Sequence, residues 1–205
     1  TPMSGNLCAL RIRAARREDA RVVARLFALA GSGMPEYLWA QESTTGETPI
    51  DVGARRAMRD QASFSWRNAD VAELDGRVAG LMLGYPTGDP TPEGRLLLPR
   101  VPAMVQPLIE LEFEAPRSYY INALAVFENC RGRGIGKRLV AAAIQRAAEN
   151  GLSRVCVQVF EHNRPALALY RHRGFALMDR RPMQEYPLDA ELGDTLLLCR
   201  KVSRG

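Results

Sequence analysis

Residues 122–139 read NALAVFENCRGRGIGKRL, and this stretch decides the fold. It completes an apolar run, Tyr119–Phe127, that is rich in strand-forming residues. Three glycines follow at every second position, and the apolar residues after them recur at the spacing of one helix face. The stretch therefore predicts a strand, a glycine-rich turn and a helix from Gly134 to Asn150.

The glycine-rich turn has the composition of an anion site. Glycine permits positive φ and lets backbone N–H groups approach a ligand closely. The first turn of the following helix adds unpaired N–H donors and the positive end of the helix dipole. Four basic side chains surround the turn: Arg131, Arg133, Lys137 and Arg138. Together these features predict a site for an anion, most often a phosphate.

The chain after this helix predicts a parallel crossover. Residues 153–160 are β-branched and apolar, which favours an inner strand parallel to Tyr119–Phe127, joined by a right-handed connection. Asn163 is expected to cap a further helix with Pro165 in its first turn, and Gly174 to end it. Residues 175–178 and 194–202 are expected to be closing strands.

The first half of the chain alternates helix and hairpin signals. Residues 10–13 predict a strand and residues 16–30 a helix. A short helix is expected from Pro35 to Trp39, and another, capped by Thr48, from Pro49 to about Asp60. Asp75-Gly76 lies between two alternating runs and is the strongest short-range signal for a hairpin.

The segment between the predicted hairpin and the predicted strand Tyr119–Phe127 is harder to interpret. Residues 86–107 hold six of the thirteen prolines, so an irregular excursion is expected. In residues 108–114 a strand would place Glu110, Glu112 and Glu114 on one face, whereas a helix would pair only Glu110 with Glu114. We favour the helix, which would end before Pro116.

Composition narrows the class of protein. A chain of 205 residues with 46% hydrophobic and 25% charged residues is typical of one globular domain. No apolar run approaches the ~20 residues that span a bilayer, so no membrane association is expected. The net charge of +5 comes from Arg residues spread along the chain, which argues against a nucleic-acid surface. Four cysteines without a Cys-x-x-Cys pair predict reduced, mostly buried thiols and a cytoplasmic protein.

Two motifs resemble a known family. The segment Leu124-Ala-Val-x-x-x-x-Arg131-Gly-x-Gly-x-Gly136 resembles the acetyl-CoA pyrophosphate loop of the GNAT superfamily of N-acetyltransferases. The later Asn163-x-x-Ala166-x-x-x-Tyr170-x-x-x-Gly174-Phe175 resembles that family's second signature, in the expected order. A proline common in relatives is absent at Glu128-Asn129, a departure that should leave the loop intact.

The resemblance implies both a fold and an activity. The fold would be α/β (α+β), with a mixed, mostly antiparallel sheet of six to seven strands flanked by helices and one parallel strand–helix–strand crossover. Residues 8–203 would form a single acetyltransferase domain behind a flexible leader, residues 1–7. The activity would be transfer of an acetyl group from acetyl-CoA, without a metal, to the primary amine of a small molecule or peptide. Direct attack in a ternary complex is implied, and a homodimer is left open.

Roles for individual residues also follow from the resemblance. The strand backbone at Leu124, Ala125 and Val126 would bond the pantetheine arm, and Asn163 would touch that arm or the phosphates. The Tyr170 hydroxyl would protonate the departing thiolate. The pyrophosphate would be held by the backbone amides of Arg131, Gly132, Arg133, Gly134, Ile135, Gly136 and Lys137.

Several alternatives stay open. Tyr170 also fits a core position, and Asn163 would cap its helix in any case. Some relatives carry a glutamate as general base at the position of Tyr120, so the base here is unassigned among Glu73, a glutamate of residues 110–114, and Tyr120 acting through water. His162 and His172 are too isolated to indicate a metal site. An acyl-CoA-binding sensor or scaffold is the main alternative function, and a basic nucleic-acid-binding module is the other.

Overall fold

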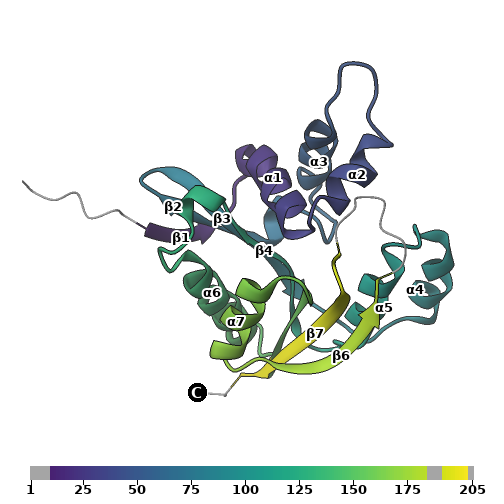
Figure 1. The fold of residues 1–205 in the computed structure, drawn as a ribbon, viewed down its shortest axis with the longest axis vertical. Coiled ribbons are helices and arrows are strands. Elements are labelled where there is room, and N and C mark those ends of the chain that lie inside the picture. Colours follow the sequence, from purple (N-terminus) through teal and green to yellow (C-terminus); the bar gives the residue numbers. More distant parts are fainter. Residues whose placement is uncertain (1–9, 184–190, 203–205) are drawn as a thin grey trace, which may run out of the picture. The chain divides into compact units, whose positions relative to one another are not determined.

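A computed structural model describes residues 10–183 and 191–202 of the chain (Figure 1). Seven strands form one sheet in the order β1-β2-β3-β4-β5-β7-β6. The strands are β1 (Leu10–Ala14), β2 (Ala69–Leu74), β3 (Arg77–Pro86), β4 (Tyr119–Val126), β5 (Arg154–Phe160), β6 (Ala176–Pro182) and β7 (Asp194–Lys201). The helices are α1 (Ala20–Ala30), α2 (Met34–Ala40), α3 (Pro49–Ala57), α4 (Pro92–Leu97), α5 (Gln106–Phe113), α6 (Ile135–Glu149) and α7 (Arg164–His172). The mixed sheet predicted from the sequence is confirmed.

The chain divides into two compact units, which are described in turn. The first runs to Leu83 and also includes Ala123–Ala142. The second comprises Gly84–Asn122 and the chain from Ala143 onward.

Antiparallel pairing organises the first unit. β1 pairs with β2, and β2 pairs with β3 through a register that opposes Leu74 and Arg77. Asp75 and Gly76 between them have φ of 50° and 78°, as a tight hairpin turn requires. The Asp-Gly prediction is therefore confirmed.

Gly80 of β3 sets how closely the next elements pack. A Cβ built on Gly80 would lie 3.0 Å from the carbonyl oxygen of Ala125 and 3.1 Å from Ile135 Cγ2. Both distances are shorter than most packing contacts, so a side chain at this position would push β4 and the first turn of α6 away from β3.

Helices α1, α2 and α3 form a cluster around an aromatic centre in the first unit (Figure 1). The ring centroids of Phe27 and Phe64 are 4.3 Å apart, and Trp39 stacks 5.6 Å from Phe64. Gly53 of α3 lies against Trp39, because a Cβ there would meet the indole at 2.4 Å. A glycine inside α3 costs helix propensity but allows close packing on the indole.

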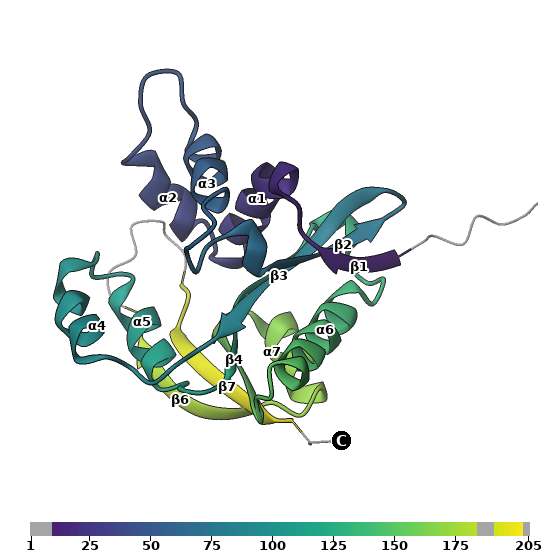
Figure 2. The same cartoon turned by 180° about the vertical axis from the view of Figure 1, so that it is seen from behind.

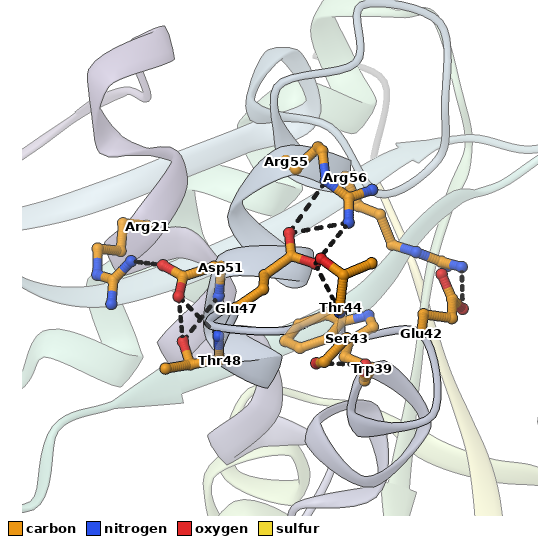
Figure 3. Close-up of polar contacts among 10 residues, drawn as sticks. All are labelled: Arg21, Trp39, Glu42, Ser43, Thr44, Glu47, Thr48, Asp51, Arg55 and Arg56. Carbon is orange, nitrogen blue, oxygen red and sulfur yellow. Dashed lines mark hydrogen bonds and ion pairs between the residues drawn. The ribbon is translucent and has the colours of Figure 1, made fainter.

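The cap that Thr48 was predicted to provide at the start of α3 is confirmed (Figure 3). Asp51 N donates to Thr48 Oγ1 at 3.2 Å, and Thr48 N donates to the Asp51 carboxylate at 2.9 Å, which completes a capping box. Arg21 also pairs with Asp51. The Thr48 hydrogen bonds and this arginine lower the pKa of Asp51 to about 2. The helix ends at Ala57, before the predicted Asp60.

The second unit contains the parallel pairing of strands. β5 pairs in parallel with β4, where Tyr120 opposes Cys156, and antiparallel with β7. Cys156 and Cys199 face each other across β5 and β7 and are joined by a disulfide. The expectation of reduced thiols is wrong for this pair, because the register of two strands, which spacing along the chain does not reveal, brings them together. Cys8 lies outside the described residues.

The prediction of an irregular segment over residues 86–107 is wrong in part, because residues 92–100 are helical and residues 106–107 begin α5. Thr91 caps α4, accepting from Gly94 N at 3.1 Å with Pro92 in the first turn, and α5 begins at Gln106. The prediction relied on the number of prolines. Two of these prolines, Pro92 and Pro107, lie in the first turns of helices, where proline is favoured. The helix favoured for residues 108–114 is confirmed, and Figure 2 shows α4 and α5 side by side.

Other helix and strand boundaries differ from the predicted ones by a few residues. A 3-10 turn, Arg17–Asp19, precedes α1, and β6 extends four residues beyond the predicted Met178. None of the helices in the described ranges is long and apolar enough to cross a membrane.

Candidate active site

The strand before the glycine loop presents two faces. Ala123 and Ala125 are buried, whereas Leu124 and Val126 are partly exposed. The next residue, Phe127, donates its N–H to Ala79 O at 2.9 Å, and a 3-10 turn over Glu128–Cys130 ends the strand. Leu124 and Val126 therefore lie on the accessible face expected to meet the pantetheine arm.

The turn itself has the backbone of an anion site. Gly132 and Gly134 have φ of 77° and 76°, in the left-handed region that favours glycine. A Cβ added at either position would meet nothing within 4 Å, so these glycines border open space. The close approach expected for a ligand is therefore sterically available.

The backbone N–H groups of this turn are also available to an anion. In the described part of the chain, the N–H groups of residues 132–136 donate to no backbone acceptor. The N–H of Arg131 is different, because it donates to Glu128 O at 3.2 Å. Arg131, Arg133 and Lys137 have exposed side chains around these donors. Such a set of donors and cations fits a diphosphate.

The side chains near the turn differ in their partners. Arg131 Nε donates to Val126 O at 3.2 Å. Arg138, also expected to add charge near the turn, donates to Leu10 O at 2.7 Å and so ties α6 to β1. Cys130 is a free, partly exposed thiol that lines a hollow with Val78 and Phe127.

Asn163 and Tyr170 belong to the second unit. Asn163 Oδ1 accepts from Ala166 N at 3.2 Å, so the predicted cap of α7 is confirmed. Tyr170 is 3% exposed, and its ring lies 5.6 Å from that of Phe175. Burial raises the pKa of Tyr170 above its ordinary value near 10. The phenol is therefore protonated at neutral pH and has a proton to donate.

A polar cluster that the sequence did not predict as a unit also lies in the second unit. The Tyr85 hydroxyl donates to Glu112 Oε1 at 3.0 Å, and Asn122 Nδ2 donates to the Tyr85 oxygen at 3.2 Å. The Tyr120 ring lies 5.7 Å from the Tyr85 ring. Glu112 and Tyr120 were weighed individually from the sequence, but Tyr85 joins them from β3, 27 residues before Glu112. No local pattern signals that contact.

The carboxylates proposed as general base differ in their surroundings. Glu73 pairs with Arg11 at 2.9 Å and Arg13 at 2.7 Å, and the Arg13 hydrogen bond holds its pKa below the usual range. Glu110 pairs with Arg181 at 3.3 Å. Burial instead raises the pKa of Glu112. Among these three, Glu112 alone combines burial with a raised pKa.

A metal site finds no support in residues 10–183 and 191–202, where no group of three or more His, Cys, Asp or Glu side chains is placed to hold an ion.

The fold is that of an α/β protein with a glycine-rich turn between strand β4 and helix α6. The chain belongs to the acetyltransferase (GNAT) family, whose model matches residues 34–175.

Similar proteins have names that describe acetyltransferases. "Uncharacterized N-acetyltransferase YhfO" of Bacillus subtilis is 39% identical over 29% of this chain and 40% of its own length. An "L-methionine sulfoximine/L-methionine sulfone acetyltransferase" of Pseudomonas aeruginosa is 27% identical over 66% of each chain. A crystal structure of a mosquito arylalkylamine N-acetyltransferase like 5b has a TM-score of 0.68 at 15% identity, covering 94% of this chain and 100% of that one. The chain thus spans from 40% to 66% of the length of these two curated relatives.

Proposed function

We propose that the protein is an N-acetyltransferase that transfers the acetyl group of acetyl-CoA to a primary amine by direct attack in a ternary complex. The observation that carries the proposal is the row of N–H groups at residues 132–136, which donate to no backbone acceptor among the described residues and are bordered by open space and exposed cations. This row follows the strand whose accessible face holds Leu124 and Val126.

Each part of the proposed site has a physical task. The amides from Gly132 to Lys137, with the side chain of Arg131, hold the diphosphate through charge-assisted hydrogen bonds. The backbone at Leu124, Ala125 and Val126 bonds the pantetheine arm, and a strand N–H stabilises the oxyanion that forms when the amine attacks. Tyr170 donates its proton to the departing sulfur. Asn163 caps α7 and positions the chain entering it.

The acceptor is proposed to be the primary amine of a small molecule or peptide. The name of the Pseudomonas aeruginosa relative supports including an amino-acid-like amine among the candidates. A suitable panel is L-methionine sulfoximine, L-lysine, spermidine, kanamycin and a short peptide with a free N-terminus.

The first experiment measures binding and turnover together. Acetyl-CoA should raise the melting temperature of the protein, and at least one amine of the panel should release free CoA. Tyr170→Phe should leave acetyl-CoA affinity unchanged and lower kcat about 100-fold, because only proton donation is lost.

Tyr119→Phe is the matched control, since it removes another buried phenol, one that donates to Gly84 O at 3.1 Å. Its kcat should stay near that of the unmodified protein. Binding of acetyl-CoA without release of CoA to any amine would favour a sensor or scaffold. No binding at all would refute the proposal.

A further inference from the structure

We propose that Glu112 is the carboxylate that takes the proton from the acceptor amine, and that Tyr85 and Asn122 are positioning residues that hold it. This inference rests on the proposed acetyl transfer. It assigns a catalytic residue that neither the glycine loop nor α7 supplies.

The chemistry of the side chains fixes which group donates and which accepts in each hydrogen bond of this cluster. Asn122 Nδ2 has only hydrogens to offer, so the Tyr85 oxygen accepts at 3.2 Å. The single hydroxyl hydrogen of Tyr85 is then left to donate to Glu112 Oε1 at 3.0 Å. Glu112 acts as the acceptor in this arrangement. One carboxylate oxygen is held in place by β3 and β4, while the other is not needed for the hydrogen-bond chain.

The surroundings of Glu112 favour proton uptake. Tyr85 from β3 and Tyr120 from β4 are the titratable groups that face it. The nearby cations are engaged elsewhere: Arg181 of β6 pairs with Glu110, and Arg95 of α4 lies over the Phe113 ring. Within the described ranges no arginine or lysine pairs with Glu112. Burial therefore raises its pKa, offset in part by the Tyr85 hydrogen bond.

The position of the cluster along β4 suits this role. Asn122 precedes Leu124 by two residues, so alternation places both on the same face of the strand. Leu124 belongs to the segment proposed to bond the pantetheine arm. The hydrogen-bond chain that holds Glu112 thus ends on Asn122, a residue of the same strand as the proposed pantetheine segment.

The reaction step balances without any further reagent. The amine lone pair forms the new C–N bond at the acetyl carbonyl carbon, and the C–S bond breaks with its electron pair left on sulfur. Glu112 accepts the proton lost by nitrogen, and Tyr170 protonates the sulfur. Solvent then takes the proton from Glu112 and returns one to Tyr170, so the products are an amide and a thiol.

The test compares Glu112→Gln with Glu114→Gln, which makes the same chemical change two residues further along. CoA release is measured with each amine of the panel between pH 5 and 9. Glu112→Gln should lower kcat/KM about 100-fold and abolish the acidic limb of the pH profile. Its thermal shift with acetyl-CoA should be unchanged. Glu114→Gln should retain both the rate and the acidic limb.

Tyr85→Phe supplies a second readout, which a purely structural role would not produce. The Tyr85 hydrogen bond lowers the pKa of Glu112, so its loss should raise that pKa further. The acidic limb of the pH profile should then move to higher pH. If Glu112→Gln fails to fold, the pH profile of Tyr85→Phe decides the question. An acidic limb that moves to higher pH supports the role of Glu112, and an acidic limb at the same pH overturns it.

The inference and the proposed function fail differently. A Glu112→Gln protein that turns over at the full rate with an intact acidic limb overturns the role of Glu112 and leaves acetyl transfer standing. An unmodified protein that releases no CoA with any amine overturns both.

Discussion

Two pairs of glycines in the first unit contrast sharply. A Cβ on Gly53 would lie 2.4 Å from the Trp39 ring, and one on Gly80 would lie 3.0 Å from a β4 carbonyl oxygen. A Cβ on Gly132 or Gly134 would meet nothing within 4 Å. The first pair have φ that any residue adopts, and the second pair are left-handed.

The space beside each glycine thus distinguishes glycines that allow close packing from glycines that leave room for a ligand. Gly53 and Gly80 are needed because the protein itself fills the space beside them. Gly132 and Gly134 border space that the protein leaves unfilled. Substitutions in the first pair should therefore act on stability, and those in the second on ligand binding.

The largest expected effect is at Gly134. Gly134→Glu should weaken acetyl-CoA binding at least about 100-fold, or about 2.7 kcal/mol, because it places a carboxylate among the diphosphate donors. Isothermal titration calorimetry measures the affinity. Gly134→Ala is the control, since it carries the same left-handed strain of about 1–2 kcal/mol without the charge. An unchanged affinity in Gly134→Glu would remove the loop from the site.

Gly53→Ala should act on stability alone. Its methyl group overlaps the rigid Trp39 ring, so the free energy of unfolding should fall by about 2 kcal/mol, measured by urea denaturation. Acetyl-CoA affinity should not change. Gly88→Ala, at an exposed position with open space, should leave stability within about 0.5 kcal/mol. A loss of acetyl-CoA affinity in Gly53→Ala would contradict the assignment of Gly53 to packing alone.

Gly80→Ala tests the packing glycine that lies next to the loop, where a change in packing can also reach ligand binding. The added methyl group presses on Ala125 O and Ile135, at the strand and helix that flank the loop. Stability should fall by about 1 kcal/mol, and acetyl-CoA affinity should fall less than in Gly134→Glu. Differential scanning fluorimetry with and without acetyl-CoA reports both quantities. Equal stability with lost affinity would mean that Gly80 acts only on the loop.

The smallest effect concerns the start of α3, the helix that holds Gly53. The pKa of Asp51 is lowered from 3.8 to about 2, so its contribution to stability is present above pH 3.8 and is lost as the pH falls towards 2. Thermal denaturation should show Asp51→Asn less stable than the unmodified protein at pH 6, with the gap closing below pH 3. A gap that persists at pH 2 would contradict the assigned pKa.

Local signals in the sequence predicted much of the fold. The Asp75-Gly76 turn, the Thr48 cap and the Asn163 cap each depend on a few neighbouring residues, and each is confirmed. Strand and helix around the glycine loop were predictable for the same reason. The missed helix α4 carried a comparable local signal in Thr91-Pro92, which the number of prolines nearby obscured.

Contacts between distant segments were not predictable in this way. The disulfide of Cys156 and Cys199 joins residues 43 positions apart, and Tyr85 reaches Glu112 across 27. Such pairs depend on strand register and on how α5 packs, which no spacing in the chain encodes. The resemblance to a family supplied roles for the loop and Tyr170, but it left the base open because Tyr120 replaces the carboxylate found in some relatives.

The free, partly exposed thiol of Cys130 bears on how turnover is recorded. A colorimetric reagent that reports CoA by reacting with sulfhydryl groups will also react with this side chain and give a burst proportional to enzyme concentration. The attached reagent would then lie one residue from Arg131, at the edge of the proposed diphosphate site, and would mimic inhibition. Following loss of the thioester absorbance, or working with Cys130→Ser, avoids both artefacts.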